Sequence, residues 1–361
     1  MSVGPDPLRD TISPRASAVA RAEQARTRAE VRLAGTIADF FLDADSRLDE
    51  RTRLTLAHVL RGIVEAIEAD IRRHAARLLS GDTAVAEAML AGEGVMARLT
   101  RSGVLRDDEL MDELIARVRH DLIADALPVA IAGPDAASLL VRLAGAPDSV
   151  VASAANALLA SESRRRAVNE NGIVAGSELP ADLHHRLVWW IAAAIREGST
   201  PAAETDRAIT EAAERSLAAH DEGDRPEAVA TRLAAAIDAR PNELASLLVE
   251  AIGDRRLALF VAVLAGAIGV DFDQARAITL EPEGDRLWLA LRAADLDRPT
   301  IARIGLALSD ADPRRDIEAF ADALDAIAGV AVEDARAGLA SLALKRDFRA
   351  AMRALDRSNR R

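Results

Sequence analysis

The chain has 361 residues and a net charge of −12, with 58 acidic residues against 46 basic ones. Half of its residues are hydrophobic, only 2% are aromatic, and it contains no Cys and no Tyr. A half-apolar chain of mixed charge is not that of a disordered protein. The lack of Cys excludes disulfides, thiolate metal sites and a Cys nucleophile. Because Ala and Leu supply most of the apolar share, the composition favours helices over sheets.

The acidic balance also limits the partners that we expect. Binding to nucleic acid requires a positive face that displaces counterions, so nucleic acid is not an expected partner. The first ten residues hold no apolar core of a signal peptide, and the longest apolar run, 257–270, is too short to span a bilayer. No basic amphipathic helix stands out in support of a peripheral membrane role. We therefore expect a cytoplasmic protein without membrane insertion.

Helix signals follow one another in the first part of the chain. Ser13 and Pro14 predict the start of a helix that runs to about Asp43. The clearest helix is predicted over 50–79, where apolar residues recur at spacings of three and four. Shorter helices are predicted over 83–91, 95–101, 107–118 and 122–129, and after the Pro-Asp turns at 134–135 and 147–148.

Residues 161–178 break this pattern, because three consecutive Arg residues are followed by a polar run that ends in Gly172. We interpret this segment as an exposed loop or linker between an N-terminal helical stack, 1–160, and a C-terminal one, 179–361. Further helices are predicted over 180–196, 201–219, 226–237, 241–252, 255–268, 272–280, 284–294, 299–308, 313–327, 332–344 and 346–355.

Four segments together resemble one bacterial family: Ile37–Ser80, Ser102–Ile115 (SGVLRDDELMDELI), Leu179–Glu197 (LPADLHHRLVWWIAAAIRE) and Arg255–Arg298. The chain is similar there to the family catalogued as domain of unknown function 2336, uncharacterised proteins with HEAT-like helices. The resemblance implies an all-α fold, an α-solenoid-like stack of helical hairpins in one piece or in two sub-domains. It implies no catalytic residue and no activity.

The sequence motifs of common enzymes are missing. The patterns GxxxxGK[ST], GxSxG and HExxH do not occur. His184 and His185 are adjacent, so on a helix they diverge by about 100° and do not suit one shared ion. The acidic loop 220–224 is more typical of a solvated surface than of a metal site. We therefore expect no enzymatic activity, no bound metal and no cofactor.

Two groups of residues remain as binding candidates. On the predicted helix 180–196, Trp189 falls among polar residues that include His185 and Arg186, whereas Trp190 shares a face with apolar residues. Trp189 is therefore either covered by another segment or exposed as an anchor for a partner. The second group is the densest basic cluster, Arg164, Arg165 and Arg166. It could bind a phosphate, an acidic partner or the chain's own acidic face, or it is simply a solvated loop or helix end.

Two functions of different classes fit these features. The leading hypothesis is a non-enzymatic protein-interaction scaffold or regulator with an extended helical surface and an unknown protein partner. The alternative is a sensor that binds a nucleotide-like anion between helices through Arg164, Arg165, Arg186 and Trp189. Nucleic-acid processing is a third hypothesis, and the net charge opposes it.

Overall fold

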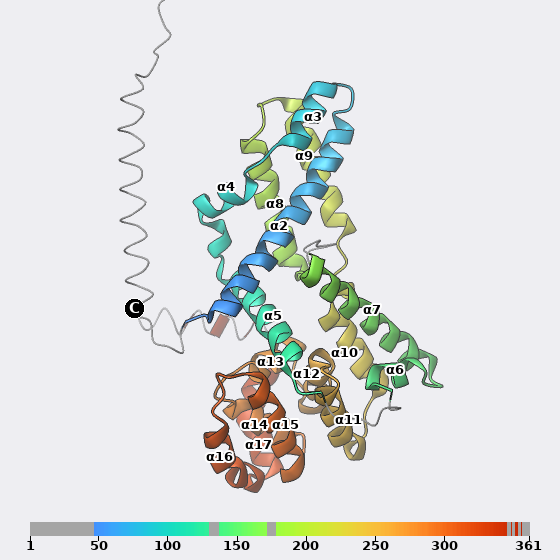
Figure 1. Cartoon of the computed structure of the whole chain (residues 1–361), viewed down its shortest axis with the longest axis vertical. Helices are drawn as coiled ribbons and strands as arrows, with labels where there is room; N and C mark the ends of the chain where they lie inside the picture. The colour runs from blue at the N-terminus through green and yellow to red at the C-terminus, as the bar shows by residue number, and fades with distance from the viewer. Residues whose placement is uncertain are drawn as a thin grey trace, which may run out of the picture. The chain divides into compact units, whose positions relative to one another are not determined.

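The computed structural model describes residues 47–129, 137–171 and 178–344, together with residues 348, 351, 352 and 355. Within these ranges every regular element is a helix and none is a strand (Figure 1). The prediction of an all-α helical stack is confirmed, and the HEAT-like character of its repeats stays a prediction. The helix predicted over 14–43 lies outside the described residues, as does most of the one predicted over 346–355.

The first described elements are α2 (Glu50–Leu78), α3 (Thr83–Ala91), α4 (Val95–Ser102), the 3₁₀-helix η2 (Val104–Arg106) and α5 (Asp108–Ala126). Local chemistry sets their ends. The Asp82 side chain accepts two backbone hydrogen bonds at the start of α3, and the Asp107 side chain accepts one at the start of α5. Gly103 ends α4 with a φ of 80°, a conformation that glycine adopts without strain. α5 is continuous where two separate helices were predicted.

The next elements are α6 (Leu139–Ala144), α7 (Ser149–Asn171), α8 (Ala181–Glu197), α9 (Ala203–Ala219) and the 3₁₀-helix η3 (Glu222–Asp224). Asp148 caps α7, as the Pro-Asp turn predicts. The loop or linker predicted over 161–178 is wrong for 161–171, because α7 continues through those residues. One of the polar residues there, Arg165, is buried and forms an ion pair with Glu227. Residues 172–177 lie outside the described ranges.

The remaining elements are α10 (Pro226–Ile237), α11 (Pro241–Gly253), α12 (Leu257–Ile268), α13 (Phe272–Thr279), α14 (Asp285–Ala293), α15 (Arg298–Ala311), α16 (Ile317–Gly329), α17 (Val332–Leu339) and the 3₁₀-helix η4 (Ala340–Ala343). Pro226 and Pro241 occupy the first turns of α10 and α11. The start predicted for α16 at Pro313 is wrong, because Asp316 caps this helix and Asp312 pairs with Arg314 instead.

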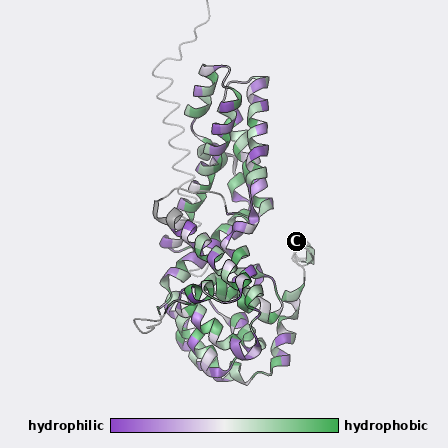
Figure 2. Cartoon of the chain, turned by 90° about the vertical axis from the view of Figure 1, so that its right-hand side faces the viewer, coloured by the Kyte–Doolittle hydropathy of each residue, from purple (hydrophilic) through white to green (hydrophobic). Residues whose placement is uncertain are grey.

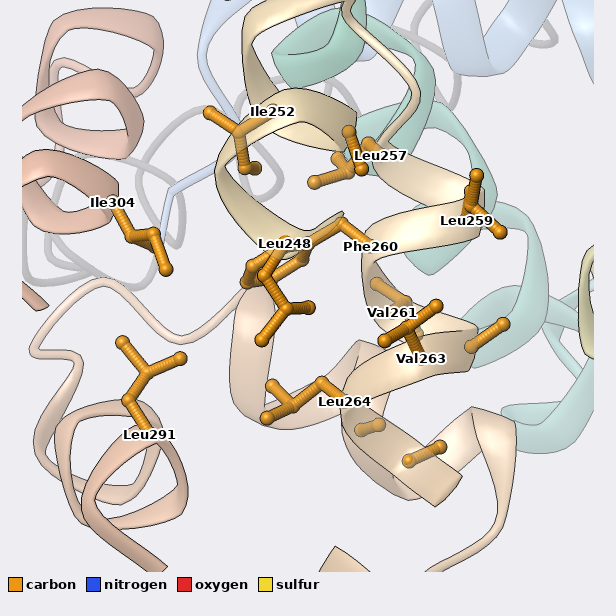
Figure 3. Packing of buried hydrophobic residues seen from close by; sticks show 14 of the residues in the cluster. Leu248, Ile252, Leu257, Leu259, Phe260, Val261, Val263, Leu264, Leu291 and Ile304 are labelled. Carbon is orange, nitrogen blue, oxygen red and sulfur yellow. The ribbon is translucent and has the colours of Figure 1, made fainter. Parts of the chain in front are cut away.

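Buried apolar side chains of α5, α6 and α7 join those of α10 to α17 in one cluster. α12 is central to it, since every residue from Leu257 to Ala265 is buried. Figure 3 shows this helix beside Leu248 and Ile252 of α11, with Leu291 and Ile304 across from it. Because residues from both sides of 161–178 enter the same cluster, that segment does not separate two cores.

A second set of buried apolar side chains comes from α2, α4, α8 and α9, and it includes Ile63, Ile67, Ile71, Leu99, Leu187, Ile191 and Ile209. Figure 2 shows apolar residues concentrated where helices face one another and polar residues on the outward faces, the pattern of amphipathic helices. Within the described ranges, no single helix has the length and apolar content needed to cross a bilayer. α12 and α13 meet those criteria only as a pair bent by 114°.

Candidate functional site

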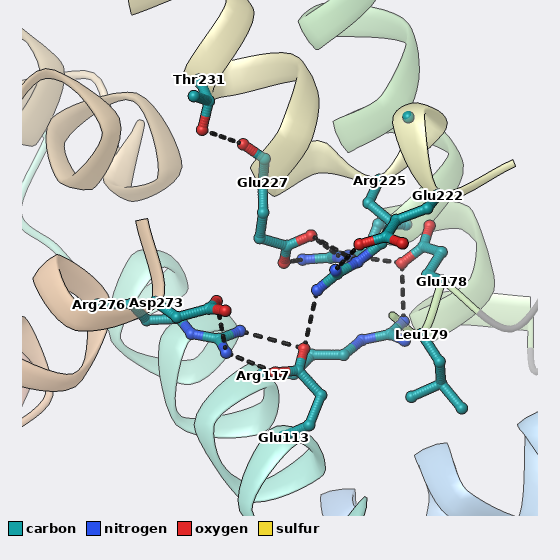
Figure 4. Close-up of polar contacts among 12 residues, drawn as sticks. Glu113, Arg117, Glu178, Leu179, Glu222, Arg225, Glu227, Thr231, Asp273 and Arg276 are labelled. Atoms are coloured by element: carbon teal, nitrogen blue, oxygen red, sulfur yellow. Dashed lines mark hydrogen bonds and ion pairs between the residues drawn. The ribbon is translucent and has the colours of Figure 1, made fainter. Parts of the chain in front are cut away.

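Four helices meet at a buried network of ion pairs, which Figure 4 shows from close by. Its core has four guanidinium groups and four carboxylates, from Glu113, Arg117 and Asp121 of α5, Arg165 of α7, Glu178 before α8, Arg225 and Glu227 at the start of α10, and Arg276 of α13. The three α5 residues are spaced by four, so they lie along one face of the helix. The core of the network is therefore balanced in charge.

Arg165 lies at the centre of one half of the network. Its Nη1 and Nη2 donate to the two carboxylate oxygens of Glu227, at 2.7 and 3.1 Å. Its Nε donates to Glu178 at 2.7 Å, and Asp121 lies 3.5 Å from Nη1. Burial by itself lowers the pKa of Arg165, but the carboxylates, Glu227 first, outweigh burial and hold this pKa well above its usual value. Burial likewise raises the pKa of Glu227, and Arg165 outweighs it, so that pKa lies well below the ordinary range.

Glu113 joins the other half of the network. It accepts hydrogen bonds from Arg276 of α13 at 2.5 and 3.2 Å and from Arg225 at 3.0 Å. Arg225 also lies 3.7 Å from Glu227, which links the two halves, and Arg117 lies 3.0 Å from Glu178. These ion pairs and hydrogen bonds thus form one continuous network that connects α5, α7, α10 and α13 with Glu178, which precedes α8.

His120 is buried beside these charges on α5. Its Nδ1 has no hydrogen-bond partner within the described ranges. Burial lowers the pKa of His120 to about 3, with Arg165 and Arg276 acting in the same direction and Glu227 against it. The ring is therefore neutral at pH 7 and does not serve as an acid. Each guanidinium of the network is paired with a carboxylate. The network therefore connects helices inside the protein, and none of its four guanidinium groups is left unpaired to bind a ligand.

The structure separates the residues of the predicted basic cluster. Arg165 points inward to the network, whereas Arg164 and Arg166 are exposed on α7. Arg186 on α8 belongs to another contact, because its guanidinium donates to Asp107 at 2.9 Å and to Glu109 at 2.5 Å. The structure therefore gives Arg165 and Arg186 different carboxylate partners and does not unite them in one anion site.

The three tryptophans have different surroundings. Trp189 is half-buried, and its indole N–H donates to Nε2 of the exposed His185 at 3.2 Å. Trp190 is also half-buried, although its spacing predicts a core position. Trp288 of α14 is buried against Phe320 of α16, with ring centroids 4.4 Å apart, so it packs between helices.

An open groove of about 630 Å³ lies along α2 and α4. It is lined by Arg61 and Glu65 of α2 and by Met96, Ala97, Thr100 and Arg101 of α4. Neither Arg61 nor Arg101 forms an ion pair or hydrogen bond in the part of the chain that the structure describes. The sequence analysis did not single out this groove, since its residues come from two helices and form no motif.

The described residues hold no group of three or more His, Asp or Glu side chains arranged to bind a metal ion. The buried His184 and the partly buried His220 stack face to face with centroids 3.9 Å apart. Stacked rings do not direct their nitrogens at a common point, so this pair is not the start of a metal centre.

These features define an all-helical protein whose main cluster of charged residues is buried. Its open groove is lined by two arginines, Arg61 and Arg101, that have no ion-pair partner within the described ranges. The chain belongs to the bacterial family described as "Uncharacterised protein conserved in bacteria", domain of unknown function 2336, which matches residues 97–340 and so more than half of it. The matched range contains the whole ion network and α8. No curated protein and no solved structure matches the chain.

Proposed function

We propose that this protein is a non-enzymatic interaction scaffold that binds an acidic segment of a partner protein in the groove between α2 and α4. The observation that carries the proposal is the pair of unpartnered guanidinium groups, Arg61 and Arg101, that line this groove. Their charge contrasts with the net charge of −12 on the chain, and neither forms an ion pair within the described ranges, whereas Arg165 and Arg186 have carboxylate partners. Glu65 also lines the groove, so its lining carries two cations and one carboxylate.

The composition of the groove suits a protein segment. Pockets for small molecules enclose most of their ligand, whereas an open groove fits a helix that lays one face along it. Met96 offers an adaptable apolar contact, and each of the two guanidinium groups can donate two parallel hydrogen bonds to a carboxylate. We infer a partner helix that presents acidic residues on both sides of an apolar one. Trp189 and His185 stay candidates for a partner contact on α8.

The alternative function, a sensor of a nucleotide-like anion, is less favoured by these contacts. An anion at Arg165 must displace Glu227 from a buried two-pronged pair, and an anion at Arg186 must displace Asp107 and Glu109. Displacing an internal carboxylate leaves a second charge without its partner, which opposes binding.

The experiment places a photo-crosslinking amino acid at Ala97, an exposed residue of the groove, and identifies the peptides that it captures in the native bacterial host. We expect an acidic segment, and at least tenfold less product when Arg61→Glu and Arg101→Glu are combined, because each lost charged contact contributes about 1.5–3 kcal/mol. The matched control, Arg164→Glu with Arg166→Glu, makes the same charge change on α7 and should leave the yield unchanged. A neutral or basic captured segment, or an equal yield in both variants, contradicts the proposal.

A further inference from the structure

The groove residues Arg61 and Glu65 belong to a longer exposed stripe on α2. Leu54, His58, Arg61 and Glu65 follow one another at spacings of four, three and four, so they lie on one face of the helix. All four are exposed, Leu54 over 61% of its surface. Within the described ranges, none of the three polar side chains forms an ion pair or a hydrogen bond. Spacings of three and four are those of a seam along which a second helix packs.

The outward face of α9 carries a stripe with the same spacings. Arg207, Glu211, Glu214 and Ala218 are separated by four, three and four residues, and all four are exposed. The charged members of this stripe have no ion-pair partner in the part of the chain that the structure describes. As a whole, α9 holds four acidic and two basic residues. It is therefore an acidic helix, of the charge that the groove between α2 and α4 attracts.

The two stripes complement each other when α9 runs antiparallel to α2. Their spacings coincide in that direction, and the opposed pairs are Leu54 with Ala218, His58 with Glu214, Arg61 with Glu211, and Glu65 with Arg207. A parallel α9 would instead place Leu54 against Arg207 and Glu65 against Ala218. The antiparallel arrangement also sets the positive end of each helix dipole beside the negative end of the other.

The matching stripes belong to different copies of the chain. α2 and α9 contribute buried side chains to the same interior, Ile67 and Ile209 among them. The two stripes lie on the opposite, exposed sides of their helices, so they point away from that interior and do not meet within one chain.

We propose that the acidic segment in the groove between α2 and α4 is α9 of a second copy of this chain. The proposal rests on the proposed function, because it fills the same groove and uses the same cations, Arg61 and Arg101. The contact joins two different faces, so copies associate head to tail. Its ion pairs are exposed to solvent, and the association is therefore weak and sensitive to salt.

Charge reversal on either stripe tests this register. In sedimentation of the purified full chain at low salt, the average mass should rise with concentration, and high salt should reverse the rise. Arg61→Glu and Glu211→Arg should each weaken the association constant about tenfold, because an attraction becomes a repulsion. Both changes in one chain, or an equal mixture of the two variants, should restore association, since opposite charges meet again. Arg164→Glu on α7 and Glu197→Arg at the end of α8 make the same changes at exposed sites outside the stripes and should associate like the wild type.

A photo-crosslinking amino acid at Ala97 in the purified chain identifies the segment that fills the groove. We expect a covalent dimer whose crosslinked peptide comes from α9, with about tenfold less product in the Glu211→Arg variant. The double variant, Arg61→Glu with Glu211→Arg, should recover the product, which shows that the loss does not come from misfolding.

Three results would overturn the proposal: a wild type that stays monomeric at low salt, an association that the double variant does not restore, and a crosslinked peptide from outside α9. The proposed function is judged separately. If the purified chain is monomeric while Ala97 captures an acidic segment of another protein in the host, this inference fails and the proposed function stands. If the segment captured in the host is not acidic either, both fail.

Discussion

Arg165 of α7 and Glu227 of α10 form a buried two-pronged ion pair, with nitrogen–oxygen distances of 2.7 and 3.1 Å, although 62 positions separate them in the chain. A charge removed from water in this way needs its partner, because the cost of desolvation remains when the partner is lost. The pair therefore makes the packing of α7 on α10 depend on two particular residues.

Replacement of Arg165 tests this dependence. Arg165→Met leaves Glu227 buried without its main cation, and we expect a loss of about 3–5 kcal/mol in the free energy of unfolding. Arg164→Met and Arg166→Met remove exposed cations on either side and should stay within about 0.5 kcal/mol of the wild type. Denaturation in urea measures all three. Combining Arg165→Met with Glu227→Gln should recover part of the loss, and equal stabilities of the 164 and 165 variants would show that the pair does not hold the helices.

His120 gives a prediction about pH. Its pKa in the folded protein is about 3, below the ordinary 6.5, so between these values the unfolded chain binds a proton that the folded chain does not. Stability therefore rises with pH across this window, by about 1.4 kcal/mol per unit for this ring, and the contribution is complete above the unfolded pKa. His184, with a pKa of about 4 lowered mainly by burial, acts in the same direction.

The raised pKa values of Asp121 and Glu162, both caused by burial, act in the opposite direction because they favour protons on the folded form. The informative quantity is thus the difference in slope between the wild type and His120→Asn, measured by urea denaturation from pH 4 to pH 7. His58→Asn changes an exposed ring on α2 and is the control. An unchanged slope in His120→Asn would mean that this ring is accessible to protons in the folded protein.

Replacement of a helical glycine by Ala should lower the stability of the protein at Gly305 and raise it at Gly266. A Cβ built at Gly305 of α15 would lie 2.1 Å from the ring of Phe320, whereas one built at Gly266 of α12 meets nothing within 4 Å. Gly305→Ala forces the buried ring of Phe320 to move and should cost about 1–3 kcal/mol. Gly266→Ala should add up to about 1 kcal/mol through helix propensity. Thermal melts of the two variants check both, and a stable Gly305→Ala would show that Phe320 has room to shift.

The ends of the helices depend on residues that are close in the sequence, whereas the buried ion pairs depend on residues that are far apart in it. The helices predicted over 83–91 and 226–237 have those same bounds, because Asp82 and Pro226 set their starts within one turn. The segment 161–171 was misjudged because its three consecutive Arg residues resemble a solvated loop, whereas α7 continues through them and buries Arg165 against Glu227 of α10. A helix cap can be predicted from a few neighbouring residues, whereas an ion pair between residues 62 positions apart cannot.

One feature of the α5 sequence indicates the buried ion network. On α5, the buried residues Leu110, Leu114 and Val118 recur at a spacing of four, and Glu113 and Arg117 fall on the same stripe. Charged residues at core positions of an amphipathic helix indicate buried partners of opposite charge. The identities of these partners, Arg225 and Arg276 for Glu113 and Glu178 for Arg117, could not be predicted from one sequence, because nothing local determines which distant segment packs there.

The last prediction concerns Arg315, whose guanidinium lies 5.6 Å from the ring centroid of the buried Trp288 and donates to the carbonyl of Thr279 at 2.6 Å. Arg315→Met loses the cation–π contact and leaves that carbonyl without this donor. We expect a loss of about 1–3 kcal/mol. Replacing Trp189 and Trp190 by Phe leaves Trp288 as the only indole, so its fluorescence reports unfolding at this position. Arg303→Met, an exposed change on α15, is the control. If both variants unfold at the same urea concentration, the contact with Trp288 contributes nothing, because removing a stabilising cation must shift the midpoint.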